Sequence, residues 1–144
     1  MERIKRTIKI CTILSIILLG LTAHSASAAT PTMSKKEVLA LLDEKLAGNR
    51  NKKAIIATIE CESGFQNIQS RVPSKGGPNG REDSWGIVQI HLPSWRGIVT
   101  KQQALDQEFA IDFITKHFAL GHQRYWTCWR NLSRAGVIPS KVYT

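Results

Sequence analysis

Residues 54–65, AIIATIECESGF, form the stretch that decides the fold of this chain. At about 100° per residue, the isoleucines of this stretch and the carboxylate Glu62 fall on one face of a helix. Gly64 follows directly, and glycine readily adopts the left-handed conformation that ends helices. The pattern predicts a helix over residues 51–63 whose apolar face packs into a core, with Glu62 in its last turn.

The position of Glu62 on an apolar face predicts a raised pKa. Burial disfavours the charged form of a carboxyl group, and the partial negative charge at a helix C-terminus acts in the same direction. Glu60 falls on the opposite face, where a solvated carboxylate is expected. A glutamate that keeps its proton near neutral pH can serve as a general acid. The alternative is a structural carboxylate paired with an arginine such as Arg124 or Arg130.

Three further helices are predicted, over residues 34–48, 106–121 and 124–135. Ser34 and Glu37 have the spacing of a capping box, and Asp106 is suited to cap the second of these helices. The apolar face of that second helix is expected to comprise Phe109, Ala110, Phe113, Ile114 and Phe118. In the last helix, one apolar stripe is expected to comprise Tyr125, Cys128, Trp129 and Leu132.

The segment between the Glu62 helix and the next motif is polar and rich in turn formers. Residues 66–83 contain Gly76-Gly77-Pro78 and Asn79-Gly80, which predict a long loop or a small hairpin. The sequence SWGIVQI at residues 84–90 follows. The fold class is therefore mainly α, as a single small helical domain with a long polar loop or small β-hairpin before the Gly-x-x-Gln segment.

The first 28 residues have the order of a secretory signal peptide. An apolar run over 10–21 precedes Ala-Ser-Ala at 26–28, which is a typical cleavage site. The run is shorter than the roughly 20 residues that span a bilayer, although a retained N-terminal anchor would have similar flanks. We expect an exported domain over 29–144, periplasmic, cell-wall associated or secreted, without stable membrane insertion after cleavage.

Of the three cysteines, Cys11 lies within the predicted signal peptide, which leaves Cys61 and Cys128. In an oxidising compartment an even pair within a small domain is a candidate disulfide. The alternative is two buried free thiols.

The chain is basic, with a formal net charge of +9. A basic surface attracts polyanions in general, including bacterial walls, anionic membranes and nucleic acid. Export argues against nucleic acid, so an anionic cell-wall surface is the expected partner. A single domain of this size is expected to be a monomer.

Taken together, AIIATIECESGF at 54–65 and SWGIVQI at 84–90 resemble the superfamily of lytic transglycosylases and goose-type lysozymes. Its pattern is an apolar helix ending in Glu-Ser and then Gly-x-x-Gln a short loop away, matched here by Glu62-Ser63 and by Gly86 to Gln89. The resemblance covers roughly residues 50–130 and implies a lysozyme-like α+β fold. It implies cleavage of the β-1,4 bond between N-acetylmuramic acid and N-acetylglucosamine in peptidoglycan glycan strands, without a cofactor.

By this resemblance Glu62 is the general acid, and Ser84 and Gln89 line the sugar groove beside it. The family usually shows Ala-Tyr-Asn near the C-terminal end, where this chain has Tyr-Trp-Thr-Cys-Trp, so Tyr125 is carried over from a partial match. Trp126 falls off the apolar stripe and is predicted to stack on a sugar, whereas Trp129 is expected in the core. A Cys61–Cys128 bridge would place this helix beside Glu62.

Hydrolysing glycosidases generally use two carboxylates. In the family that this chain resembles, one glutamate can suffice, because the sugar's own 6-hydroxyl attacks and closes a 1,6-anhydro ring. Asp83 could instead position a water, which would give a lysozyme-type hydrolase, or it could be a turn residue. A non-catalytic wall-binding module with the same fold is the further alternative.

The sequence predicts no metal site. His91, His117 and His122 do not have metal-ligand spacing.

Overall fold

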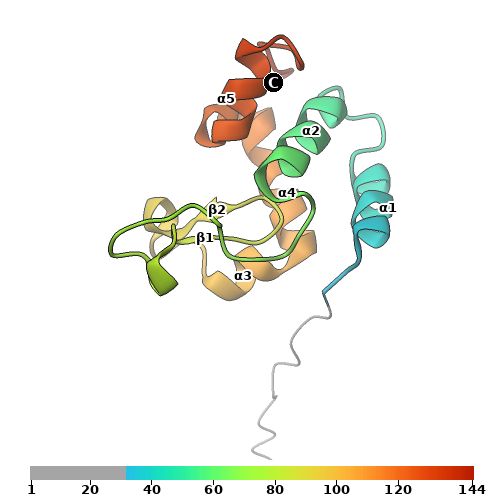
Figure 1. Ribbon diagram of the computed structural model, residues 1–144. Helices are drawn as coiled ribbons and strands as arrows, with labels where there is room; N and C mark the ends of the chain where they lie inside the picture. Colours follow the sequence, from blue (N-terminus) through green and yellow to red (C-terminus); the bar gives the residue numbers. More distant parts are fainter. Residues whose placement is uncertain (1–31) are drawn as a thin grey trace, which may run out of the picture.

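The computed structural model describes residues 32–144, which contain five α-helices and one two-stranded antiparallel sheet (Figure 1). The helices are α1 (Lys35–Lys45), α2 (Lys52–Ser63), α3 (Lys101–Leu105), α4 (Gln107–Ala119) and α5 (Thr127–Arg134). The strands are β1 (Ser84–Trp85) and β2 (Ile90–His91), and the 3₁₀ turns are η1 (Pro78–Gly80), η2 (Leu92–Trp95) and η3 (Gln123–Tyr125). The mainly α fold class is confirmed. The predicted signal peptide, residues 1–28, lies outside the described residues.

Three helix ends form through the local signals that the sequence contains. The Ser34 hydroxyl accepts a hydrogen bond from the Glu37 amide, and the Glu37 carboxylate accepts one from the Ser34 amide, which completes the capping box of α1. Gly64 closes α2 in the left-handed conformation, with φ 61°. The Asp106 carboxylate accepts from the amide of Phe109 at 3.1 Å and caps α4. The predictions for these three ends, the start of α1, the end of α2 and the start of α4, are confirmed.

The last helix differs from the prediction. Residues 123–125 form the 3₁₀ turn η3, and the helix α5 begins only at Thr127, after the extended residue Trp126. Because the backbone is not a continuous helix across this point, Tyr125 does not share a stripe with Cys128 and Trp129. Tyr125 is exposed, whereas Trp129 is buried.

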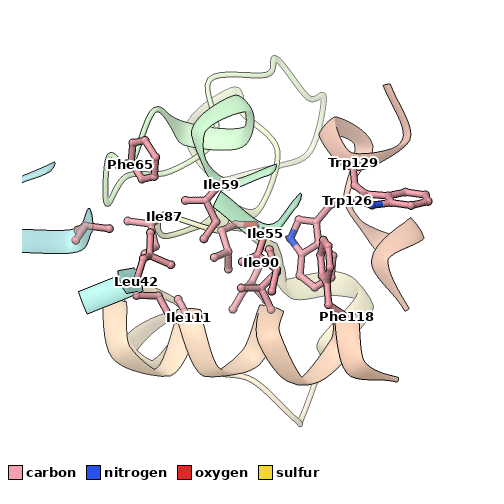
Figure 2. Close-up of a cluster of buried hydrophobic side chains, with 14 of the residues drawn as sticks. Leu42, Ile55, Ile59, Phe65, Ile87, Ile90, Ile111, Phe118, Trp126 and Trp129 are labelled. Carbon is pink, nitrogen blue, oxygen red and sulfur yellow. Dashed lines mark hydrogen bonds between the residues drawn. The ribbon is translucent and has the colours of Figure 1, made fainter. Parts of the chain in front are cut away.

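Helix α4 lies at the centre of the fold, where it contacts α1, α2 and α3. Its buried apolar side chains are Ala110, Ile111, Ile114 and Phe118. Ile111 was not among the residues predicted for this face. Phe109 and Phe113 are only half-buried. Figure 2 shows Ile111 and Phe118 of α4 in one cluster with Ile55 and Ile59 of α2, with Ile87 and Ile90, and with Trp126. Burial of this apolar surface is the main contribution to the stability of the fold.

The two-stranded sheet forms around the Gly-x-x-Gln segment. Ser84 pairs with His91 and Trp85 with Ile90, so residues 86–89 are the turn that joins the two strands. The preceding polar segment is a long loop that folds back on itself through the antiparallel bridge of Pro73 with Arg81, and the bridge of Gln69 with Trp85 attaches it to the sheet. Figure 1 shows this hairpin near the C-terminal end of α2, with α5 beside α2.

Candidate active site

Glu62 lies in the last turn of α2, where the start of α5 approaches it. Its side chain is half-buried, and Oε1 accepts a hydrogen bond from the backbone amide of Cys128 at 3.0 Å. Among the described residues Glu62 forms no ion pair. The guanidinium of Arg130 instead donates to the carbonyl of Arg124 and to the hydroxyl of Thr127. The structural alternative, a Glu62–arginine pair, is therefore not formed.

The pKa of Glu62 is raised above its usual value. Burial is the largest cause, the Cys128 amide opposes it, and the negative charge of Glu82 raises the pKa further. The positive charge of Arg130 lowers the pKa in turn. The pKa of Glu62 is therefore shifted in the direction predicted from sequence. The N-terminus of α5 also points at this carboxyl group, and a helix N-terminus favours the anion.

Ser63, the residue after Glu62, connects α2 to the hairpin turn. Its hydroxyl donates to the carbonyl of Ile87 at 2.6 Å. Ile87 and Val88 are fully buried, so the turn is held from the core side as well. The two pieces of the sequence motif, Glu-Ser and Gly-x-x-Gln, therefore contact each other directly.

The turn itself depends on Gly86 and Gln89. Gly86 has φ +79°, and a Cβ there would lie 1.8 Å from the carbonyl oxygen of Ala104. Gln89 also has a positive φ, 53°, and its side-chain amide donates to the carbonyls of Gly86 at 2.8 Å and Ile68 at 3.1 Å. Gln89 thus fastens the turn to the loop.

A hollow of about 160 Å³ opens beside this turn, and we call it the aromatic hollow. Carboxylate, amide, imidazole and hydroxyl groups lie among aromatic rings on its wall, as in many small-molecule sites, where a few polar groups fix the orientation of a ligand. Its lining residues are Glu82, Gln89, Ile90, His91, Ser94, Trp95, Phe113, Tyr125 and Trp126.

Glu62 is not itself among the lining residues, but two neighbours connect it to the hollow. Glu82 lies on the wall and acts electrostatically on Glu62. Trp126 lies on the wall two residues before Cys128, whose amide binds Glu62. Glu62 is thus linked to the aromatic hollow through the charge of Glu82 and through the chain segment that joins Trp126 to Cys128.

Three of the four predicted groove residues line the hollow. Gln89 and the 59% exposed Tyr125 lie on its wall, and the Tyr125 ring meets Trp95 edge-on at 5.4 Å. Trp126 also lines it but is only 5% exposed, because its indole N–H donates to the carbonyl of Val88 at 2.8 Å and its ring packs in the core. Ser84 is buried in β1 and does not line the hollow.

Glu82 and Trp95 were not predicted from sequence, whereas Asp83 was a candidate to position a water. The Asp83 carboxylate accepts from the indole N–H of Trp85 at 2.7 Å, which gives it a structural role in the hairpin. Glu82, one residue earlier, lies on the wall of the hollow. Side chains of neighbouring residues in an extended segment point in opposite directions, so Glu82 and Asp83 are not expected on the same wall. This alternation was the signal available from sequence.

Cys61 and Cys128 form the predicted disulfide, with sulfurs 2.00 Å apart, and it joins α2 to α5. No described group of three or more histidine, cysteine, aspartate or glutamate side chains is arranged to hold a metal ion. None of the helices between residues 32 and 144 is long and apolar enough to cross a membrane.

Comparison with protein-family models, with curated proteins and with solved structures finds no match to this chain.

Proposed function

We propose that this protein is a peptidoglycan lytic transglycosylase with a lysozyme-like fold, acting on the β-1,4 bond between N-acetylmuramic acid and N-acetylglucosamine. The observation that carries the proposal is Glu62, a half-buried carboxyl group with a raised pKa, on which the charge of Glu82 acts from the wall of the aromatic hollow. The contact of Ser63 with Ile87 supports it, because it joins the two motifs that resemble this superfamily.

In the proposed reaction, Glu62 first acts as a general acid. Its proton passes to the glycosidic oxygen that leaves, which requires the protonated form that burial favours. The resulting carboxylate then accepts the proton of the muramic 6-hydroxyl, whose oxygen closes the 1,6-anhydro ring. One glutamate serves both steps, and no cofactor is required.

The proposed location is outside the cytoplasm, in the periplasm, at the cell wall or in the medium. The exported domain, residues 29–144, has a formal net charge of +6, which would attract it to an anionic wall at low ionic strength. This attraction concerns the encounter with the wall, whereas cleavage depends on Glu62.

Product analysis of the wild-type protein tests the proposal. We expect purified protein to release soluble muropeptides from isolated wall sacculi, with products that carry 1,6-anhydro ends. By mass, these products are lighter than hydrolysed ones by one water molecule. Sacculi that remain insoluble, under conditions in which a known muramidase releases them, would contradict the proposed function.

The position of Glu82 favours hydrolysis as a second candidate. Glu82 is a second carboxylate on the wall of the aromatic hollow, close enough to Glu62 to raise its pKa. An inverting glycosidase uses two carboxyl groups, one as the general acid and the other as the base that activates a water. In this reaction Glu82 would take a proton from water, whose oxygen attacks the anomeric carbon while Glu62 protonates the leaving oxygen.

The substitution Glu82→Gln distinguishes the two reactions. If Glu82 is the base, the variant is expected to lose the hydrated product by about 10²-fold or more, since a general base contributes that much. If Glu62 acts alone, the variant should still form anhydro ends. Asp83→Asn is the matched control, because its amide oxygen can still accept from Trp85 and its effect on either product should be small. Mass analysis of both variants gives the answer.

A further inference from the structure

Cys61 and Cys128 both lie beside Glu62, the proposed acid, and they belong to different helices. Cys61 precedes Glu62 in α2, and the backbone amide of Cys128 in α5 donates to Glu62 Oε1 at 3.0 Å. A disulfide joins the side chains of these same two residues, with Cα atoms 5.7 Å apart. The residue that binds the carboxyl group is therefore the residue that is covalently linked to its neighbour.

We propose that the Cys61–Cys128 disulfide is a positioning element of the active site, which holds the Cys128 amide on Glu62 Oε1 and so directs the acid proton to Oε2. The inference rests on the proposed function, because it concerns the proton that Glu62 would donate. Cys128 is a positioning residue here, since it acts through Glu62.

The choice of oxygen follows from hydrogen-bond chemistry. A protonated carboxyl group has one hydroxyl oxygen, which donates, and one carbonyl oxygen, which accepts. The Cys128 N–H is a donor and requires the accepting oxygen, which makes Oε1 the carbonyl oxygen and Oε2 the hydroxyl. The proton then has one fixed site, as proton transfer to a bound substrate requires.

Other contacts keep α5 on the body of the protein but do not hold this amide. The Trp126 indole binds the carbonyl of Val88, and Trp129 is buried. Arg130 donates to Arg124 and Thr127, both within the same part of the chain. Without the bridge, α5 should therefore stay packed through Trp126 and Trp129, while Cys128 loses its covalent link to α2 and its amide is no longer held at Glu62.

Two charged groups act on Glu62 besides the amide. Glu82 acts from the loop and raises its pKa, and Arg130 acts from α5 and lowers it. Removing the bridge changes neither charge. The lost amide contact was lowering the pKa, so its removal should raise the pKa of Glu62 further.

The test uses the double variant Cys61→Ser/Cys128→Ser and nuclear magnetic resonance of labelled protein. In the oxidised wild type, the amide shift of Cys128 should titrate together with the side-chain carboxyl of Glu62. In the variant, the amide at position 128 should lose most of this response, and the midpoint of Glu62 should move to higher pH. Cleavage should show kcat about tenfold lower with an unchanged KM, because the acid proton is no longer fixed on one oxygen in the orientation that transfer requires.

Reduction of the wild type is the matched control without a substitution. An added dithiol supplies two electrons and two protons, the bridge becomes two thiols, and the dithiol becomes its cyclic disulfide. Cys61 is exposed and open to this reagent. Reduction should reproduce the shifts of the variant, reoxidation should reverse them, and circular dichroism should show retained helix in both.

Three results would overturn the inference. The first is an amide shift of Cys128 in the oxidised wild type that does not change as Glu62 titrates. This measurement does not depend on the folding of a variant. The second is a titration midpoint of Glu62 that is unchanged after removal of the bridge. The third is a downward shift of this midpoint, which would show that the bridge maintains the burial of Glu62 instead. A wild type that cleaves no glycan would contradict the proposed function, yet leave the resonance measurements decisive for the bridge.

Discussion

Glu62→Gln is expected to lower the rate of wall clearing by about 10³-fold, within the range that a general acid contributes. Glutamine keeps the shape of the side chain, and its carbonyl oxygen can still accept from the Cys128 amide, but it has no proton to donate. The measurement is turbidity loss of a sacculus suspension, with wall binding determined in parallel by sedimentation.

Glu60→Gln is the matched control in the same helix. Glu60 lies on the exposed face of α2, where its carboxylate is 3.4 Å from the ammonium of Lys35. Exposed pairs of this kind contribute little to stability, so clearing by this variant should be unchanged. Unchanged clearing by Glu62→Gln would contradict the enzyme assignment. Binding without clearing by the wild type itself would indicate the non-catalytic wall-binding module.

The pH dependence of the wild type belongs to the same experiment. Clearing should decrease as pH rises through the pKa of Glu62, which lies above the usual 4.5. Because the folded protein holds this proton more tightly than the unfolded chain, Glu62 lowers stability progressively as pH rises from the unfolded to the folded pKa. Glu62→Gln removes that effect, so its melting temperature at neutral pH should be no lower than that of the wild type.

Gly86→Ala is expected to destabilise the fold by about 4 kcal/mol or more, which is exceptional for one substitution. The new Cβ would lie 1.8 Å from the carbonyl oxygen of Ala104, so backbone must move, and φ +79° is unfavourable for alanine. The displaced turn carries Gln89 and meets Ser63, so activity should decrease as well. Urea unfolding followed by circular dichroism measures the change.

Gly97→Ala provides the control for backbone conformation alone. Gly97 has a similar φ, +76°, but nothing lies within 4 Å of the position of a Cβ. Its substitution should cost about 1–2 kcal/mol, the penalty for a left-handed residue. Equal destabilisation by the two variants would show that the contact with Ala104 is not what requires glycine in the Gly-x-x-Gln turn.

The helices were predictable from sequence because their signals are local. The capping residues Ser34 and Asp106 and the closing Gly64 each act within one turn of the helix they bound. Helix α3 was overlooked although Thr100 and Gln103 form a capping box of the same kind. The angular position of Glu62 followed from helical spacing alone.

The remainder of the site depends on contacts between distant segments. Trp95 reaches the hollow because the turn after β2 folds against Phe113 of α4 and Tyr125 of η3, which no local pattern specifies. Glu82 lies on the same wall, although it is distant in sequence from both rings. Trp126 was predicted from the geometry of a continuous helix, but the chain is extended at that residue. Its indole therefore turns toward Val88 and the core.

The bridge between α2 and α5 also makes a covalent ring of the chain, with 67 residues of sequence separation between its ends. The polar loop, the hairpin, α3 and α4 all belong to this ring. A protease that cuts one exposed peptide bond of the loop would open the ring without releasing a fragment. Glu62 and the hollow would remain on one molecule, so an intact backbone is not a requirement for keeping the site together.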